Sequence, residues 1–555
     1  MEFTTQLNQL MAEGVAHHLA GRFAEAVERY SWAVETAPEY GEAWRLLGIV
    51  ALQSGDNPAA RSLLERAVRI DDNDAAAHSA LGSVNESEGM LEAAYGMYTK
   101  AHTLEPADEA AVIGLARAAL GLERPTEAIA IAEAAIARGV TDAGLLRVLG
   151  AARLRLCDYA GGVEALLAAL RMQPHADAFA NLAAAYVRLY CFDEAIAACN
   201  QAIALDAAHA EANNTLGSAR AGAGSFAAAA AAYERAIALG SDEAQVNLGT
   251  LRLRAGDYRG GWPHFGANND ERRANPAFAA LPMWDGAAAP GQRLLVWPEQ
   301  GVGDTIQMAR FLPRARGLVG SLTLACPPGT LDLFRTVEGV DALIDANEHP
   351  RLDDFDVWLP TIRLPVVFDV SLDSIPAAPY LRADPERIAR FRSRLTVRQQ
   401  FRVGLVWSGN PSHQRDALRS CGLAALEPLY AVPNIAWFAL QQGTARAQQP
   451  RNGMVLIPIN AAVRDFADTA AILDQLDVLI AVDTSVAHLA GALGRAAWLL
   501  IPKQPDWRWQ LAGESSPWYP TLRLFRQGDD GEWAPVVAAI AAALRERTAN
   551  LPELR

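Results

Sequence analysis

The stretch LGIVALQSGDNPAARSLLERA, residues 47–67, decides the fold of the first half of the chain, because its frame of small residues returns along the sequence. Gly48 is followed by Gly55 seven positions later, by Ala60 five positions further, and by Ala67 after another seven. The same frame begins again at residues 81 and 216, and part of it begins at residue 248. A unit of about 34 residues that repeats in this way predicts a solenoid of stacked helix pairs.

The frame resembles the tetratricopeptide repeat (TPR), whose two antiparallel helices touch through small residues. Proline ends the second helix, because it cannot continue the backbone hydrogen bonds. Trp44 stands at the aromatic position of the repeat, and the second helices and their ends carry Tyr30, Tyr98 and Tyr233, then Pro38, Pro106 and Pro174. We count about eight repeats from residue 7 onward, and we expect a TPR superhelix over residues 1–275.

Such a superhelix predicts a concave groove that binds a peptide or an acceptor protein, with scaffolding or self-association as the alternative. Asn181, Thr215 and Asn247 fall at one inward-facing repeat position and are the candidate acceptor-binding residues. In protein O-linked glucosaminyl transferases, an asparagine ladder at this position clamps the acceptor backbone. The earlier repeats depart from that ladder and carry Ala12, Leu46 and Ala80.

Composition narrows the class of function. The chain has 555 residues, a formal charge of −15 and a pI near 5.2. Nucleic acid is excluded as the main partner, because binding its phosphates needs clustered Lys and Arg. The five cysteines include no CxxC pair and no zinc spacing, which favours a reducing cytosol. No apolar run reaches the roughly 18 residues that a membrane span needs, and we expect a cytoplasmic protein.

After Trp262 the sequence changes to short β-rich runs that alternate with helical stretches. Four runs, RLLVW, SLTLAC, DALIDA and DVWLP, precede residue 395, and six, from RVGLVWSG to LRLFRQ, follow it. Alternation of this kind predicts parallel sheets with helices on both faces. We therefore expect an α/β second half of two Rossmann-like lobes, 276–395 and 396–555, with a cleft between them.

The glycine turn in PEQGVGDTIQMARF, residues 298–311, lies between a predicted strand and a predicted helix. It begins like the dinucleotide fingerprint GxGxxG, but Ile306 replaces the third glycine, and no GK[ST] follows for a P-loop. Gly303 and Asp304 remain distinctive, because the start of a helix can hold an anion and places this carboxylate near the cleft.

Two turns of the second lobe carry polar residues at strand ends. WSGNPSHQRDALRS (407–420) offers small, hydroxyl and basic residues that suit a phosphate or diphosphate, and AVDTSVAHLAGALG (481–494) turns into a helix. Because the carboxyl ends of parallel strands meet at one edge of a sheet, the two turns together indicate a ligand site. The residues singled out are Ser408, Gly409, Asn410, His413, Arg419 and Ser420, then Asp483, Thr484, Ser485 and His488.

GVGDTIQ, SGNPSHQRDALRS, VDTSVAHLAGALG and PDWRWQ, in this order, resemble the GT-B glycosyltransferases related to the heptosyltransferase family, in the version fused to N-terminal TPR repeats. The resemblance implies that the lobe 276–395 binds the acceptor and the lobe 396–555 binds the nucleotide-sugar donor. It implies that Asp304 is the general base and that the D-T-x-x-x-H turn contacts the nucleotide. Gly303, Gln441 and Lys503 complete the implied donor-binding set, Lys503 for the donor phosphate.

The implied reaction is a direct displacement with inversion, in which Asp304 removes the proton of the acceptor hydroxyl. Arg419, Ser420, the helix start at Ser485 and Lys503 would stabilise the leaving group. No cofactor and no metal is implied. Asp354-Phe355-Asp356 matches the DxD pattern of metal-dependent transferases of another fold, and we interpret it as a solvated loop. Trp507 and Trp509 either stack on a base or sugar or pack at the lobe interface.

The resemblance favours an enzyme that transfers a sugar from a nucleotide-sugar to Ser or Thr of a protein recruited by the repeats. The specific reaction that we expect is the glycosylation of flagellin with a nonulosonic acid from a cytidine monophosphate (CMP) donor. Two alternatives stay open: a glycosyltransferase whose acceptor is a surface glycan, and a non-catalytic TPR adaptor with a degenerate GT-B half. A homo-oligomer also stays open, because alanine-rich repeats can self-associate.

Overall fold

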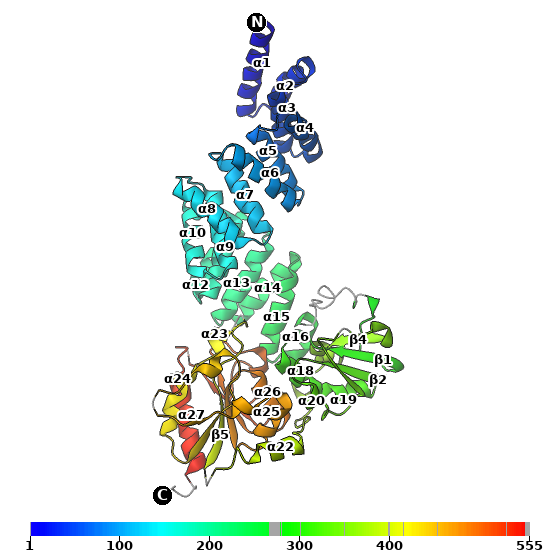
Figure 1. The fold of residues 1–555 in the computed structure, drawn as a ribbon, viewed down its shortest axis with the longest axis vertical. Coiled ribbons are helices and arrows are strands. Elements are labelled where there is room, and N and C mark those ends of the chain that lie inside the picture. The colour runs from blue at the N-terminus through cyan, green and yellow to red at the C-terminus, as the bar shows by residue number, and fades with distance from the viewer. Residues whose placement is uncertain are drawn as a thin grey trace. The chain divides into compact units, whose positions relative to one another are not determined.

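Figure 1 shows the chain as a computed structural model, which describes residues 2–265, 278, 280–299, 301–348, 350–397, 400–413, 416–451, 453–528 and 530–549. The chain divides into two compact units, residues 1–240 and residues 241–555. The predicted boundary between residues 275 and 276 lies outside the described residues. The predicted boundary between residues 395 and 396 falls between helix α22 (Pro385–Arg392) and strand β5 (Phe401–Val406).

Within residues 2–265, sixteen described helices follow one another in eight pairs, which confirms the predicted TPR solenoid (Figure 1). Seven pairs form the first unit, and the eighth belongs to the second unit. The pairs are α1 (Glu2–Leu19) with α2 (Phe23–Thr36), α3 (Gly41–Gln53) with α4 (Asn57–Ile70), α5 (Ala75–Ser87) with α6 (Leu91–Leu104), α7 (Glu109–Gly121) with α8 (Pro125–Ala137), α9 (Ala143–Arg155) with α10 (Tyr159–Met172), α11 (Ala176–Arg188) with α12 (Phe192–Leu205), α13 (Ala210–Gly222) with α14 (Phe226–Ala238), and α15 (Asp242–Arg254) with α16 (Tyr258–Phe265).

Local signals explain where these helices begin and end. Several start after an aspartate whose carboxylate accepts a backbone N–H of the first turn, as Asp56 does from Ala59 and Asp74 does from Ala77. Helices α2, α6 and α10 end two residues before Pro38, Pro106 and Pro174, as the sequence predicts.

The small residues of the repeat frame allow the two helices of a pair to approach closely. A Cβ atom built on Gly217 in α13 would lie 2.5 Å from the ring of Tyr233 in α14. The Tyr233 side chain is buried, and its hydroxyl lies 3.1 Å from Ser218 Oγ. A larger residue at position 217 would therefore push the pair apart.

The second unit contains two parallel sheets, and each of the ten β-rich runs of the sequence overlaps one of their strands. The first sheet has the order β3-β2-β1-β4 and is formed by β1 (Ala289–Trp297), β2 (Val319–Cys326), β3 (Ala342–Asp345) and β4 (Val357–Pro360). The second has the order β10-β9-β8-β5-β6-β7 and is formed by β5, β6 (Ile435–Ala439), β7 (Leu456–Ile457), β8 (Val478–Val482), β9 (Ala497–Ile501) and β10 (Leu522–Arg526).

Both sheets reverse their strand order at one point, which is where such folds bind ligands. In the second sheet the reversal lies between β5 and β8, so that the order matches that of dinucleotide-binding folds. In the first sheet it lies between β1 and β4. The turns that follow β1, β5 and β8 are therefore the expected places for ligand-binding residues.

Helices cover both faces of the second sheet (Figure 1). One face packs against α24 (Leu423–Leu426) and α27 (Ala534–Thr548). The other packs against α25 (Phe466–Leu473) and α26 (Ser485–Ala492), in a core that continues into the first lobe. The α/β architecture predicted for the second half is confirmed.

The eighth helix pair is part of the core of the second unit. Trp262 of α16 meets Trp507 edge to face at 5.3 Å between ring centroids, and Tyr258 stacks on Trp518 at 5.8 Å. Trp518 Nε1 donates to the Tyr258 hydroxyl at 2.7 Å, and Trp262 Nε1 donates to the Val370 carbonyl at 2.8 Å. All four aromatic side chains are at most 2% exposed, so the last repeat is inseparable from the lobes.

Asp356 of the DxD triplet has a structural partner. Its carboxylate accepts from Arg293 Nε at 3.2 Å and from Nη2 at 3.1 Å, which ties the start of β4 to β1.

In the part of the chain that the structure describes, every helix is too short or too polar to cross a bilayer.

We predict that a fragment of residues 241–555 folds and that a fragment of residues 276–555 does not, because the shorter one exposes the buried faces of Trp507 and Trp518. Trp262→Ala in the longer fragment should lower the free energy of unfolding by about 3–5 kcal/mol. Thermal melts followed by circular dichroism check both. Tyr430→Ala, at a side chain that is 43% exposed, is the matched control. Equal melting temperatures for the two fragments would contradict the assignment of α15 and α16 to this unit.

Candidate functional site

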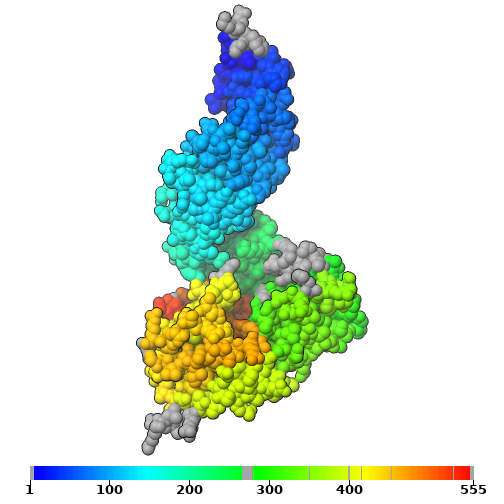
Figure 2. All heavy atoms as spheres, in the orientation of Figure 1, coloured from blue at the N-terminus to red at the C-terminus, as the bar shows by residue number. Residues whose placement is uncertain are grey.

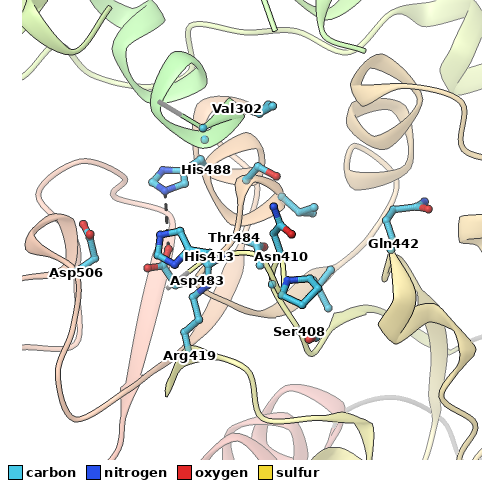
Figure 3. A pocket seen from close by; sticks show the side chains of 18 of the residues that line it. Val302, Ser408, Asn410, His413, Arg419, Gln442, Asp483, Thr484, His488 and Asp506 are labelled. Carbon is cyan, nitrogen blue, oxygen red and sulfur yellow. Dashed lines mark ion pairs between the residues drawn. The ribbon is translucent and has the colours of Figure 1, made fainter. Parts of the chain in front are cut away.

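A cavity of about 680 Å³ lies where the two lobes meet, at the carboxyl ends of both sheets. The first lobe contributes the turn after β1, residues 301–304, and the second contributes the turns after β5, β6, β8 and β9. Figure 2 shows the first lobe in green lying against the second in yellow and orange, and Figure 3 shows the cavity itself. Its volume is that of a typical small-ligand site.

The D-T-x-x-x-H turn forms one wall of the cavity. Asp483 and Thr484 follow β8, and His488 lies in the first turn of α26, between Asp483 and the turn that carries Val302 (Figure 3). Thr484 is the N-cap residue of α26, but its side chain makes no capping hydrogen bond, and its buried Oγ1 has no protein partner. A buried hydroxyl is normally hydrogen-bonded, so this one is available to a ligand.

His488 is a buried neutral imidazole. Its Nδ1 lies 3.0 Å from the Tyr519 hydroxyl, and its Nε2 lies 3.9 Å from Asp483 Oδ1. Burial, helped by the charge of Arg508, lowers the pKa of His488 to about 3. Burial also raises the pKa of Tyr519 well above its usual value, so the phenol stays protonated and can donate to Nδ1. The imidazole then carries its proton on Nε2, toward Asp483.

Asp483 has its pKa raised to about 6, first by burial and then by the neighbouring charge of Asp506. Arg419 and Arg508 act in the opposite direction. A carboxyl group that titrates near neutral pH can both accept and donate a hydrogen bond to a ligand.

Asp304 lies in the first turn of α18 (Val302–Met308), opposite the D-T-x-x-x-H turn. Its Oδ2 accepts the Gly301 N–H at 2.8 Å, and its Oδ1 pairs with Arg508 Nη2 of the second lobe. A Cβ atom on Gly303 would lie 2.9 Å from His488 Cδ2, so only glycine lets α18 come this close to α26. The predicted base therefore sits within the same cavity as the predicted donor site.

Ser408, Gly409, Ser420 and Gln441 hold the turn after β5 in shape. Ser420 Oγ accepts from Gly409 N at 2.9 Å and from Ser408 Oγ at 3.2 Å. Gln441 Oε1 accepts the backbone N–H groups of Trp407 and Ser408, and its Nε2 donates to the Ser408 carbonyl at 3.0 Å. Gln441 is 2% exposed, and Ser420 lies behind the cavity wall. These two side chains support the turn.

Asn410, His413 and Arg419 face the cavity from the same turn (Figure 3). Arg419 Nε donates to Asp416 Oδ1 at 3.2 Å, and its side chain is 18% exposed. Lys503 lies outside the described cavity wall on an exposed part of the turn after β9. Of the predicted donor-binding and catalytic residues, the cavity brings together Gly303, Asp304, Ser408, Gly409, Asn410, His413, Arg419, Gln441, Asp483, Thr484, Ser485 and His488.

Trp507 and Trp509 are packing residues. Trp507 is 2% exposed among the aromatic side chains of α16, and Trp509 is fully buried with its ring 5.3 Å from that of His488. Neither lines the cavity.

Arg508, which lies between the two tryptophans in sequence, does line the cavity, although it was not among the residues predicted from the sequence. The sequence could have pointed to Arg508, because it lies in PDWRWQ, which is one of the motifs that carry the resemblance.

The candidate acceptor-binding residues share one place in the repeats. Asn181, Thr215 and Asn247 are each the sixth residue of the first helix of their pair, in α11, α13 and α15. Thr215 is 9% exposed, and the two asparagines are half-buried. Their role in binding an acceptor stays a prediction.

Comparisons with known proteins identify the repeats. Residues 12–75 and 214–260 match one family model described as a tetratricopeptide repeat, and residues 87–152 match a second with the same description. Protein FlbA of Caulobacter vibrioides is 26% identical over 582 residues, which cover 96% of this chain and 90% of FlbA. The repeats are therefore tetratricopeptide repeats, a fold that binds peptides and proteins.

Two solved structures each resemble part of the chain. The APC/C hetero-tetramer Cut9–Hcn1 is 21% identical with a TM-score of 0.39, over 43% of this chain and 48% of that chain. A tetratricopeptide repeat protein from Parabacteroides merdae is 13% identical with a TM-score of 0.35, over 44% of this chain and 98% of that chain.

We predict that His488 stays neutral at pH 5, whereas exposed histidines titrate near their usual value of about 6.5. Because its pKa is lower in the folded than in the unfolded chain, its contribution to stability is full above pH 6.5 and is lost as pH falls toward 3. Long-range ¹H–¹⁵N NMR of ¹⁵N-histidine-labelled protein, assigned with His488→Gln, reads both charge and tautomer. Titration of His488 near pH 6.5 would disprove the buried neutral state.

Proposed function

We propose that the second unit is a metal-independent, inverting glycosyltransferase and that the repeats recruit its protein acceptor. The observation that carries the proposal is the cavity, in which Asp304 of the first lobe faces the Asp483–Thr484–His488 turn of the second. A base and a nucleotide-binding turn on opposite walls of one cavity are what a transfer between two substrates needs. Two α/β lobes with a site between them also agree with the GT-B resemblance.

The cavity suits a nucleotide-sugar donor. It lies at the strand-order reversal of both sheets, where parallel α/β folds bind nucleotides. The N-terminus of α26 lies at the cavity wall, which includes Thr484 and Ser485, and a helix N-terminus favours a phosphate. The unpartnered Thr484 hydroxyl adds a hydrogen-bond donor, and Arg419 adds a positive charge.

The reaction follows from these positions. Asp304 takes the proton of the acceptor hydroxyl while the hydroxyl oxygen forms a bond to the anomeric carbon of the sugar. The bond from that carbon to the phosphate oxygen breaks, and its electron pair leaves with the nucleotide. Arg419 and the N-terminus of α26 stabilise the charge that develops on the phosphate. Attack from the face opposite the nucleotide inverts the configuration at the anomeric carbon.

The acceptor is Ser or Thr of a protein bound by the TPR repeats, with Asn181, Thr215 and Asn247 as its backbone contacts. The specific form that we propose is flagellin as acceptor and a nonulosonic acid from a CMP donor. This form rests on the resemblance to repeat-fused transferases. A donor with one phosphate also agrees with a cavity whose described wall holds three carboxylates, Asp304, Asp483 and Asp506, and two guanidinium groups.

We predict that one of CMP, UDP, GDP and ADP raises the melting temperature of the full chain, because a ligand that binds only the folded state stabilises it by about 2.7 kcal/mol at a hundredfold excess over Kd. Thr484→Val removes a hydroxyl that has no protein partner, so it should keep the stability of the free protein and raise the Kd of the nucleotide about two- to tenfold. Thr521→Val, which removes the hydroxyl of an exposed threonine of the same lobe outside the described cavity wall, is the matched control. The absence of a shift with all four nucleotides would favour the adaptor alternative.

Asp304→Asn should lower kcat about 100- to 10,000-fold, because it removes the general base and keeps the shape of the side chain. Intact-mass spectrometry of flagellin incubated with the protein and a CMP-activated nonulosonic acid measures the transfer. Asp354→Asn, in the DxD triplet away from the cavity, should leave kcat unchanged. Transfer by Asp304→Asn at the wild-type rate would remove Asp304 from the mechanism, and transfer to a glycan alone would favour the surface-glycan alternative.

A further inference from the structure

Arg508 of the second lobe contacts two polar side chains of the first lobe. It lies in the short helix η9 (Trp507–Trp509) after β9 and is 7% exposed, yet it lines the cavity. Its Nη2 pairs with Asp304, and its Nε donates to Gln307 Oε1 at 2.6 Å. Asp304 and Gln307 are three residues apart on α18, so they present neighbouring side chains to one guanidinium group.

The second lobe fixes Arg508 from its own side. Asp506 Oδ1 accepts from Nη1 at 2.8 Å and from the Arg508 backbone N–H at 3.1 Å, and the guanidinium carbon lies 4.3 Å from the centre of the Trp507 ring. Burial alone would lower the pKa of Arg508, but Asp304 and Asp506 outweigh it and the pKa is raised. The side chain is therefore a charged, planar group with all three nitrogen atoms engaged.

These contacts hold the Asp304 carboxylate from two directions. Gly301 N–H binds Oδ2 from the first lobe, and Arg508 binds Oδ1 from the second. A carboxylate has about four lone-pair sites, so two contacts leave room for the hydroxyl of an acceptor. Without Arg508, only the Gly301 contact would orient the carboxylate.

We propose that Arg508 is a positioning residue for Asp304: it orients the base from the opposite lobe and does not itself bind the donor. The inference rests on the proposed function, since it assigns a partner to the base of that reaction. It also adds a condition to that reaction. Asp304 is correctly oriented only while the two lobes are in contact, so the removal of the acceptor proton requires the closed arrangement of the cavity.

The test compares Arg508→Gln and Arg508→Lys with the wild-type full chain. Kd is measured by titration with CMP, UDP, GDP and ADP, and kcat by mass spectrometry of the acceptor. Arg508→Gln should lower kcat about 100-fold, the usual cost of a small misplacement of a catalytic group, and should change the Kd of the nucleotide less than about twofold. Arg508→Lys should recover part of kcat, because it restores the charge but not the planar fork. Arg495→Gln, at an exposed arginine of the same lobe, is the control.

A second comparison separates positioning from an independent role. In Asp304→Asn, which already lacks the base, adding Arg508→Gln should lower the residual kcat less than about threefold, because two residues that act as one unit are not additive. A full 100-fold loss in that background would overturn the proposal. So would a tenfold rise in the nucleotide Kd of Arg508→Gln, which would make Arg508 a donor ligand.

Removal of a buried charge can also unfold a protein, so Gln307→Met provides a variant that keeps every charge. It removes the acceptor of Arg508 Nε and should lower kcat about three- to tenfold with the nucleotide Kd unchanged. An unchanged kcat in Gln307→Met would count against the positioning role of Arg508. Absence of transfer by the wild type would overturn the proposed function and this inference together, whereas normal transfer by Arg508→Gln would overturn this inference alone.

Discussion

The second unit depends on one four-residue turn, Asp506–Trp509, whose side chains point in different directions. Trp507 packs against Trp262 of the last repeat, Arg508 pairs with Asp304 of the first lobe, and Trp509 lies against His488 of the second lobe. Three parts of the structure that are far apart in sequence therefore meet at this turn. A shift of its backbone would disturb all three, because buried aromatic and ionic contacts tolerate little displacement.

This arrangement explains why the last repeat folds with the lobes. Tandem repeats normally gain stability from their neighbours on both sides. The eighth pair follows the seventh in sequence, and its aromatic side chains pack against Trp507 and Trp518. The aromatic contacts take the place of a polar capping helix. A chain built in this way brings the last repeat and the cavity into one folded unit, in which Asn247 and Asp304 both belong to residues 241–555.

Much of the fold could be predicted from the sequence, because the helix pairs and the strands follow from periodic patterns of residues. The repeat frame indicated the helix pairs, and each β-rich run contains a strand. The cavity wall could be anticipated in part, since polar residues after β5 and β8 lie at strand ends that must meet. Arg508 could not, because its role depends on a contact across 204 residues of sequence. The residue types of Lys503 and Ser420 suit a phosphate, but the sequence does not reveal where their side chains lie: Lys503 is not part of the described cavity wall, and Ser420 accepts from the Gly409 N–H in the turn after β5.

Burial also changes the chemistry of residues whose identity the sequence reveals. The sequence predicts that the D-T-x-x-x-H turn contacts a nucleotide, but it does not reveal that burial keeps His488 neutral and makes Asp483 easier to protonate. The most direct measurement is a crystal structure of the full chain soaked with CMP. The account predicts a nucleotide whose phosphate lies within hydrogen-bond distance of Thr484 Oγ1 and on the same side of the cavity as Arg419, with Asp304 still paired to Arg508. A nucleotide bound away from the Asp483–Thr484–His488 turn, or a phosphate held by Arg508 in place of Asp304, would contradict it.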